Sequence, residues 1–213
     1  MAKPNKAKFY VVWKGHQPGI YASWDAASRQ VTGFPGAQFK SFASRHEAET
    51  AFAGAYVSYA GQNTKTPKRS LDELQRLGVN LDSIVVDAAC SGVPGPMEYR
   101  GVSLRDGEQL FHMGPFPDGT NNVGEFLAIV HALTLLEQRG DSHTPVYSDS
   151  RNGITWVRQR KCSTQLERTS LNEPIFALIE AAERWLKLHA HWNDVRKWET
   201  EAWGEIPADF GRK

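Results

Sequence analysis

Cysteine is scarce in this sequence: among 213 residues there are only two, Cys90 and Cys162, and no Cys-x-x-Cys pair. This scarcity argues against a disulfide framework and a cysteine-rich zinc site, and it favours a reducing compartment. Long hydrophobic runs are also missing, because the longest apolar helix candidate, residues 126–136, contains His131 and is too short to cross a bilayer. Residues 1–8 are basic but lack the apolar stretch of a signal peptide. We therefore expect a cytoplasmic protein with no membrane contact, and nothing in the sequence indicates an obligate protein partner.

The net charge of +1 hides an uneven distribution of charge along the chain. Residues 1–70 hold ten Lys or Arg and three Asp or Glu, whereas residues 71–213 hold fifteen Lys or Arg and twenty-one Asp or Glu. The 40% apolar content is adequate for a packed core. A basic first part suits a polyanion such as nucleic acid, and an acidic second part would not bind nucleic acid well by itself. The asymmetry therefore predicts two modules with different tasks.

The basic first part has the pattern of a small α+β domain. Its aromatic residues are interleaved with lysines, which is typical of nucleic-acid binding through stacking and phosphate contacts. A unit of about fifty residues has a marginal core, so we expect an appendage and not an enzyme. Residues 60–69 are polar and predict a linker. The expected elements are strands at residues 9–13, 19–21 and 38–42 and helices at residues 24–31 and 47–52, with Ser23 and Ser44 as N-caps.

The acidic second part has the pattern of an α/β domain. Successive strands predict an antiparallel meander, and the alternation of helix and strand that follows predicts parallel pairing. We therefore expect a mixed sheet flanked by helices. The expected strands cover residues 84–87, 98–104, 109–113 and 144–148, and the expected helices begin near Asn122 and cover residues 150–160 and 173–188.

Three acidic residues stand at comparable places in these elements. Asp87 ends one apolar strand, Asp149 follows another, and Glu125 lies in the first turns of the helix between them. If the two strands pair in parallel, both aspartates fall at one edge of the sheet, where ligand sites collect. Carboxylates without histidine or thiolate ligands suit Mg²⁺ or Mn²⁺, and two such ions could hydrolyse a phosphodiester. The alternative, a helix cap or a surface charge, is favoured for any one acid alone but not for three together.

Four motifs follow one another along the second part. They are Asp87 with the turn Ser91-Gly92-Val93-Pro94-Gly95, the run Thr120-Asn121-Asn122-Val123-Gly124-Glu125, the run Tyr147-Ser148-Asp149-Ser150, and the C-terminal run from Trp203 to Lys213. Together and in this order they resemble the catalytic domain of type I ribonuclease H. The resemblance implies a ribonuclease H-like α/β fold, with a five-stranded mixed sheet of strand order 3-2-1-4-5 flanked by helices. It also implies metal-dependent hydrolysis of the RNA strand of RNA–DNA hybrids.

The resemblance also implies roles for individual residues and two Mg²⁺ ions as cofactors, with Mn²⁺ as a possible replacement. The four metal-binding carboxylates would be Asp87, Glu125, Asp149 and Asp209, and Glu205 matches a further catalytic acid near the metals. The substrate contacts would be Thr120, Asn121, Asn122, Ser163 and Thr164. Of these, Thr120 and the pair Ser163-Thr164 match a pocket that grips a DNA phosphate, a task that suits hydroxyl donors.

Residues 8–52 resemble the hybrid-binding domain of eukaryotic and some bacterial type I enzymes, a small α+β fold shared with viroplasmin. The matching residues are Phe9-Tyr10, Gly19, Trp24, Phe34-Pro35, Phe39-Lys40 and Phe42. The resemblance implies that Trp24 and Phe39 flank a deoxyribose, that Lys40 holds a DNA phosphate, and that Tyr10 lies nearby. The alternative is that these aromatic residues belong to the core. The expected domains are residues 8–54 for hybrid binding, 55–80 as a linker and 81–213 for catalysis.

The function that these features predict is an endoribonuclease that cuts the RNA strand of RNA–DNA hybrids by two-metal-ion catalysis. The RNA–DNA hybrid is then the expected partner. Two alternatives stay open: a non-catalytic hybrid-binding protein on a degenerate nuclease fold, and a nuclease of the same fold directed at DNA. The presence of all four acids favours an enzyme, and the hybrid-binding module argues against DNA as the substrate.

Overall fold

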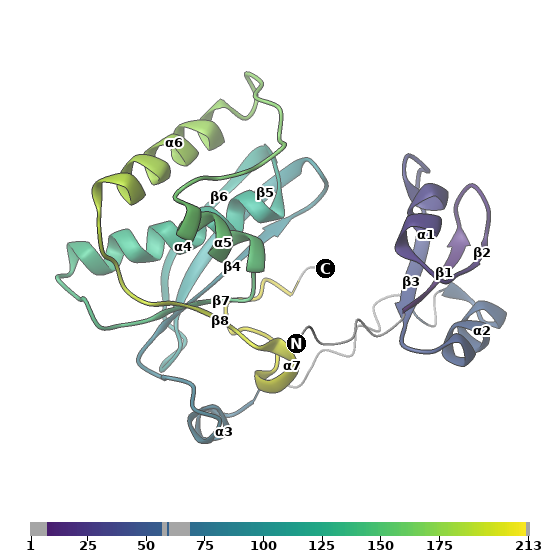
Figure 1. Ribbon diagram of the computed structural model, residues 1–213, viewed down its shortest axis with the longest axis horizontal. Helices are drawn as coiled ribbons and strands as arrows, with labels where there is room; N and C mark the ends of the chain where they lie inside the picture. Colours follow the sequence, from purple (N-terminus) through teal and green to yellow (C-terminus); the bar gives the residue numbers. More distant parts are fainter. Residues whose placement is uncertain (1–7, 57–58, 60–68, 212–213) are drawn as a thin grey trace. The chain divides into compact units, whose positions relative to one another are not determined.

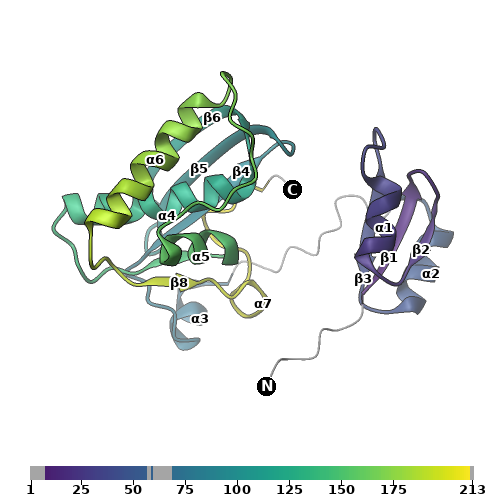
Figure 2. The same ribbon diagram turned by 45° about the horizontal axis from the view of Figure 1, so that its top comes forward.

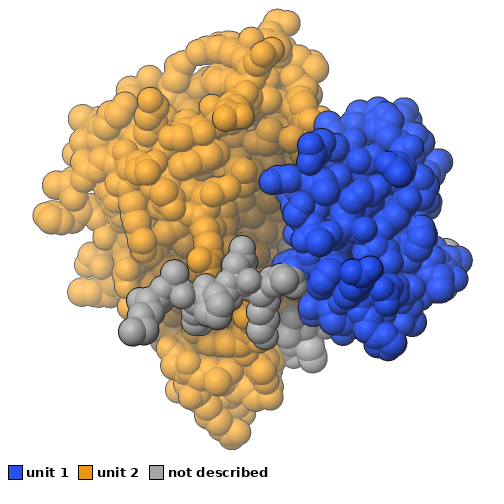
Figure 3. All heavy atoms as spheres, turned by 45° about the vertical axis from the view of Figure 1, so that its right-hand side comes forward, with its two compact units in different colours: residues 1–65 blue, residues 66–213 orange. Residues whose placement is uncertain are grey.

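The chain divides into two compact units, residues 1–65 and residues 66–213, which are coloured separately in Figure 3. The computed structural model describes residues 8–56, 59 and 69–211. Part of the expected linker, residues 57–58 and 60–68, lies outside the described residues, as does the end of the expected catalytic domain at 212–213. Among the described residues, none of the helices has the length and apolar character needed to cross a membrane.

The first unit is a three-stranded antiparallel sheet with two helices (Figure 1). Its central strand β1 pairs with both others, in the order β2-β1-β3. Val11 of β1 packs with Ala48 and Ala51 of α2 in a small buried core. The small α+β domain predicted from the sequence is thereby confirmed. The elements are β1 (Phe9–Lys14), β2 (Gly19–Tyr21), α1 (Trp24–Val31), β3 (Gln38–Phe42) and α2 (Arg45–Ala53).

Both helices of the first unit begin at the serines that the sequence predicts as N-caps. The Ser23 hydroxyl accepts a hydrogen bond from the Ala26 amide at 3.3 Å. The Ser44 hydroxyl accepts one from the Glu47 amide at 3.2 Å, and the Glu47 carboxylate accepts one from the Ser44 amide at 3.1 Å. These bonds satisfy backbone amides that a helix leaves unpaired at its start, so the serines determine where the helices begin.

The second unit is built on a five-stranded mixed sheet of order β6-β5-β4-β7-β8 (Figures 1 and 2). Strands β4, β5 and β6 form an antiparallel meander, and β7 and β8 join it in parallel. The expected strand order and the ribonuclease H-like sheet are confirmed. The elements are α3 (Leu71–Arg76), β4 (Ile84–Cys90), β5 (Gly95–Ser103), β6 (Gln109–Gly119), α4 (Asn121–Gln138), β7 (Val146–Ser148), α5 (Arg151–Gln159), α6 (Glu173–Leu188), β8 (Val195–Lys197) and α7 (Thr200–Trp203).

Several strands differ from the ranges that the sequence predicts. Strand β4 does not end at Asp87 but runs on to Cys90, because the residues after Asp87 continue the pairing with β5. Strand β5 begins at Gly95 instead of residue 98, and β7 begins at Val146 instead of residue 144.

Strand β6 runs to Gly119 instead of ending at Met113, because Pro115 and Pro117 interrupt the strand pattern. Proline lacks an amide donor but is tolerated on an edge strand, which is the position of β6. Strand β8 has only three residues, too few to show alternation. The fifth strand was therefore implied by the family resemblance alone.

The end of the expected linker is folded as part of the second unit. Ser70 and Glu73 form a capping box at the start of α3. Leu74 of this helix and Val79 after it are buried, at 2% and 3% exposure, in a cluster that includes sheet residues. These side chains hold residues 69–80 against the second unit.

The sheet of the second unit separates two hydrophobic clusters, because alternate residues of a strand face opposite sides. Ile84, Val86 and Ala88 belong to the cluster that α4 and α6 cover. Val85 belongs to the other cluster, together with Ile206 near the C-terminus. Helix α4 is buried on most of its surface, and Figure 2 shows it lying between the sheet and the other helices. One end of this central helix is therefore fixed close to β4.

Gly124→Ala should destabilise the second unit. A Cβ at position 124 would stand 2.7 Å from the Ala88 Cβ and 3.2 Å from the Met97 Cγ, so α4 would have to move away from β4. Alanine gains about 1 kcal/mol of helix propensity over glycine, but overpacking of a core costs about 1–3 kcal/mol. We expect a net loss of about 1 kcal/mol in the free energy of unfolding, measured by urea denaturation. Gln138→Ala, at the exposed end of the same helix, should change the free energy of unfolding by less than about 0.5 kcal/mol. Equal stability of both variants would contradict the close packing of α4 on β4.

Candidate active site

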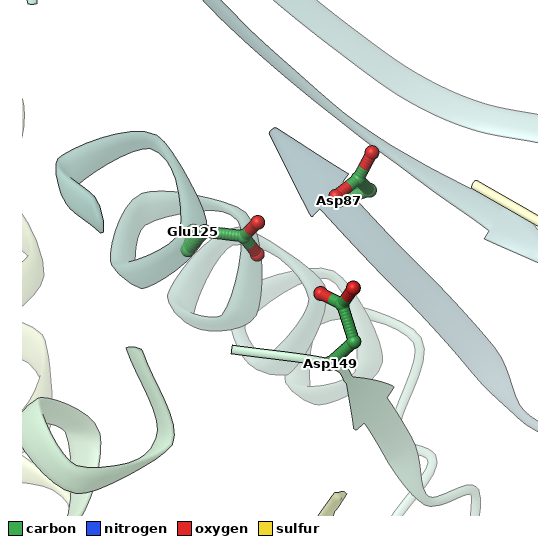
Figure 4. A group of neighbouring side chains, drawn as sticks. All are labelled: Asp87, Glu125 and Asp149. Atoms are coloured by element: carbon green, nitrogen blue, oxygen red, sulfur yellow. The ribbon is translucent and has the colours of Figure 1, made fainter. Parts of the chain in front are cut away.

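The carboxylates of Asp87, Glu125 and Asp149 meet at one end of the sheet (Figure 4). Each offers one oxygen atom, and these oxygens lie within 4.8 Å of one another. Asp87 lies in β4 and Asp149 directly follows β7. Because β4 and β7 pair in parallel, with Val86 opposite Ser148, both aspartates reach the same edge. A strand, a helix and the residue after a second strand therefore supply one acid each.

Glu125 reaches this cluster because α4 begins beside it. The Thr120 hydroxyl caps the helix by accepting a hydrogen bond from the Val123 amide at 3.4 Å. Two side chains then hold the Glu125 carboxylate: the Asn121 amide donates to Oε1 at 3.4 Å, and the Ser148 hydroxyl donates to Oε2 at 3.4 Å. The carboxylate is thus tied both to its own helix and to the end of β7.

Burial makes an ionised cluster costly. Asp87 and Glu125 are each 3% exposed. Burial raises the pKa of Glu125 well above its ordinary value; the negative charges of Asp87 and Asp149 and a hydrogen bond with Asp87 raise it further, while the Ala88 amide opposes the change. A divalent cation would relieve this repulsion, and carboxylate oxygens are the ligands that Mg²⁺ and Mn²⁺ prefer. The residues present therefore fit a divalent metal site.

Asp209 is not among the three clustered acids, but the chain beside it contacts them. The Phe210 amide donates a hydrogen bond to Asp87 Oδ2 at 3.3 Å. The half-buried Asp209 carboxylate accepts one from the Gly211 amide at 2.9 Å. The structure therefore brings position 209 beside β4, and the role of Asp209 as a metal ligand stays a prediction.

Glu205 lies in a different environment. It lines a cavity of about 260 Å³ together with Leu74 of α3 and Arg105 in the turn between β5 and β6. That turn adjoins the start of β4, because Ile84 pairs with Ser103, whereas the three acids gather toward the other end of the strand. The structure does not bring Glu205 to the three acids, and its expected catalytic role stays a prediction.

A cavity of about 650 Å³ beside the start of α4 collects four of the predicted substrate contacts. They are Thr120, Asn122, Ser163 and Thr164. Asn121, by contrast, donates its side-chain hydrogen bond to Glu125. Trp156, Gln165 and Thr169 also line the cavity, and sequence reasoning missed them. No pattern marks them, because one comes from a helix and two from an irregular loop that only the folded chain brings together.

Three aromatic residues of the first unit, Tyr10, Trp24 and Phe39, form one connected aromatic cluster. The centroid of the Trp24 ring lies 5.4 Å from that of Tyr10 and 5.6 Å from that of Phe39. Trp24 and Phe39 are 45% and 40% exposed, so neither is a buried core residue. Lys40 follows Phe39 in β3 and therefore faces the other side of the sheet, where its ammonium donates to the Tyr59 carbonyl at 3.1 Å. The phosphate contact expected of Lys40 stays a prediction.

Comparison with known families assigns both units. Residues 82–203, which include all three clustered acids, match the family model described as RNase H. The chain belongs to the ribonuclease H family. Residues 8–52 match a second model, described as the ribonuclease H1 N-terminal domain. The two matches follow one another along the chain without overlap, as the charge asymmetry predicts for two modules.

Relatives named ribonuclease H match different parts of the chain. Those of Ehrlichia chaffeensis and Agrobacterium fabrum are 36% and 34% identical, over 52% and 51% of this chain and 73% and 78% of their own length. That of Crithidia fasciculata is 48% identical over 26% of this chain, and the match spans 11% of that protein. The solved structure of ribonuclease H1 from Halobacterium salinarum is 22% identical, with 55% of this chain and 83% of that one covered and a TM-score of 0.35.

Glu125→Gln should stabilise the metal-free protein at neutral pH. Because the pKa of Glu125 is raised on folding, the folded state keeps a proton that the unfolded state releases. The free energy of unfolding therefore falls as pH rises above about 4.3, the ordinary value for glutamate, and a glutamine avoids this loss. In EDTA we expect the Tm of the variant to exceed that of the parent by a few °C near pH 7.5. The difference should vanish below about pH 4.

The exposed Glu108 provides the control. Glu108→Gln should leave the dependence of Tm on pH unchanged, and added Mg²⁺ should raise the Tm of the parent more than that of Glu125→Gln. A Tm difference between Glu125→Gln and the parent that is the same at every pH would contradict the account of the cluster.

Proposed function

We propose that this member of the ribonuclease H family hydrolyses the RNA strand of RNA–DNA hybrids with two divalent metal ions, Mg²⁺ or Mn²⁺. The ligands in this proposal are Asp87, Glu125, Asp149 and Asp209. The observation that carries it is the group of three neighbouring carboxylates, two of them buried, inside the part of the chain that matches the family. The match of the first unit to the N-terminal domain of ribonuclease H1 supports the hybrid as the substrate.

The reaction divides between the metal ions and the residues that hold them. When bound, the ions would supply an activated water and stabilise the leaving oxygen of the phosphodiester. Asn121 and Ser148 keep the Glu125 carboxylate in one orientation. In that orientation Glu125 is our candidate acceptor for the 2′-hydroxyl, the group that distinguishes RNA from DNA. The burial of Asp87 and Glu125 excludes water and so strengthens each electrostatic contact at the site.

The cavity of about 650 Å³ is our candidate site for a phosphate of the DNA strand. Hydroxyl and amide groups line it together with the carboxylates of Asp118 and Glu167. The hydroxyl and amide groups are the ones that can donate hydrogen bonds to phosphate oxygens without reading the base sequence. Asn121 contacts Glu125 instead, so we assign it to holding that carboxylate. Glu205 would have to leave its own cavity to approach the metal ions. We retain it as the candidate acid for product release.

The first unit is our candidate clamp for the hybrid. Its exposed aromatic cluster offers ring faces to sugars and bases, and its excess of Lys and Arg attracts phosphates. We propose residues 8–54 as the hybrid-binding domain, 55–80 as the connection and 81–213 as the catalytic domain. A connected clamp raises the concentration of substrate near the catalytic domain.

Two other functions are compatible with a part of these features. A non-catalytic hybrid-binding protein would keep the first unit but would not need buried acids that repel one another. A nuclease directed at DNA would keep the acids, but the match of residues 8–52 supports a hybrid instead. Hydrolysis of the hybrid is the one function that uses both units.

Asp149→Asn should abolish cleavage while hybrid binding is retained. The substitution removes a charged metal ligand but leaves the phosphate cavity and the first unit unchanged. Because a metal contact in the transition state is worth several kcal/mol, we expect kcat in Mg²⁺ to fall by at least about 100-fold. The Kd, measured by fluorescence anisotropy in Ca²⁺ or EDTA, should stay within about threefold. Asp194→Asn, which changes a largely exposed acid paired with Arg196, is the control; near-normal turnover by Asp149→Asn would refute the assignment.

Trp24→Ala and Lys40→Ala should weaken hybrid binding in different ways. Loss of a stacking ring costs about 1–3 kcal/mol and leaves the salt dependence unchanged, whereas loss of a phosphate contact lowers the slope of log K against log salt by about 1. Binding titrations at several salt concentrations separate the two effects. Phe52→Ala is the matched control, because Phe52 is as exposed as Phe39 but lies on α2. A slope unchanged by Lys40→Ala would mean that Lys40 only holds the Tyr59 carbonyl.

A further inference from the structure

Three polar residues form a row across the sheet of the second unit. Asp87 of β4 pairs with Arg100 of β5, and Arg100 pairs with His112 of β6. Residues paired across neighbouring strands lie side by side on one face of a sheet. This face is the one where Val85 packs with Ile206, so it is the face that the C-terminal segment covers.

Arg100 binds the backbone of the C-terminal segment. Its Nε donates a hydrogen bond to the Ala208 carbonyl at 2.8 Å, and its Nη2 donates one to the Asp209 carbonyl at 2.8 Å. Its guanidinium carbon also lies 4.5 Å from the centroid of the Phe210 ring. A planar guanidinium can make all three contacts at once, which a lysine ammonium cannot.

His112, next to Arg100 in the row, also contacts the Phe210 ring. The centroids of the His112 and Phe210 rings are 5.8 Å apart, and His112 Nε2 forms a hydrogen bond with a Glu98 carboxylate oxygen at 2.8 Å. The ring of Phe210 therefore lies over Arg100 and His112 while its amide donates to Asp87. Residues 204–211 contain no helix or strand. The buried Ile206 and Ala208 anchor the first part of this segment, and the contacts of Arg100 and Phe210 hold its last part.

We propose that Arg100 is a positioning residue that fastens the C-terminal segment so that Asp209 is presented beside Asp87. This inference rests on the proposed role of Asp209 as a metal ligand. Arg100 holds the segment by two carbonyls, and the neighbouring Phe210 amide holds it to Asp87 itself. Loss of the guanidinium would therefore free the segment that carries Asp209 and weaken the hydrogen bond from the Phe210 amide to Asp87.

The direct test is amide exchange in the metal-free full-length protein. In Arg100→Met we expect the amides of Phe210 and Gly211 to exchange at least about tenfold faster, because the C-terminal segment can then open without breaking the guanidinium contacts. The exchange rates in Arg100→Lys should fall between those of Arg100→Met and the parent. This variant keeps the test valid if Arg100→Met does not fold. Arg196→Met removes an arginine of β8 that is paired with Asp194, and the exchange rates of both amides should stay unchanged. Unchanged exchange in both Arg100 variants would overturn the proposal.

Kinetics separate positioning from a general effect on stability. Arg100→Met should lower kcat by about 10- to 100-fold, as expected for a misplaced ligand, and leave KM for the hybrid within about threefold. In an Asp209→Asn background the same substitution should lower kcat by less than about threefold, because the effects of substitutions in residues that act as one unit are not additive. Additive losses would overturn the proposal. Full cleavage by Asp209→Asn alone would instead refute the metal role of Asp209, while the exchange measurement would still report whether Arg100 fastens the segment.

Discussion

Repulsion among three clustered carboxylates, two of them buried, is the constraint on which the second unit depends. Asp87, Glu125 and Asp149 come from three elements, and their oxygens lie within 4.8 Å of one another. Such a group is unfavourable without a cation, as the raised pKa of Glu125 indicates. The packing of the fold must therefore hold it together: β4 beside β7 in parallel, and α4 pressed on β4. In the proposed function, a divalent metal ion would relieve this repulsion.

Binding and chemistry are assigned to different parts of the chain in this account. An acidic catalytic unit repels the phosphates of its substrate. In the proposed function, hydrogen-bond donors in the cavity beside α4 and the basic first unit would offset this repulsion. Trp24 and Phe39 are 45% and 40% exposed, so neither is a buried core residue, and both rings are open to the contact proposed with the hybrid. Arg100 joins β5 to the C-terminal segment that carries Asp209, the fourth acid of the proposed site.

Local patterns predicted much of the fold and three of the acids. Ser23 and Ser44 marked helix starts because a cap is a local hydrogen bond, and Asp87 stood out because a charged residue follows three apolar ones, although β4 continues beyond it to Cys90. Arg100 gave no such signal, since its partners are carbonyls more than a hundred positions away in the chain. Asp209 lies in an irregular segment and became visible only through the family resemblance. Contacts between distant segments depend on the folded sheet and leave no periodic trace in the sequence.

Hydrolysis of the hybrid can be measured by incubating the full-length protein with end-labelled RNA–DNA hybrid, double-stranded RNA and duplex DNA, each with Mg²⁺, with Mn²⁺ and with EDTA. We expect internal cuts in the RNA strand of the hybrid, dependence on the metal ion, and intact DNA in every mixture. Cleavage of duplex DNA, or tight binding of the hybrid without any metal-dependent cut, would refute the proposed function.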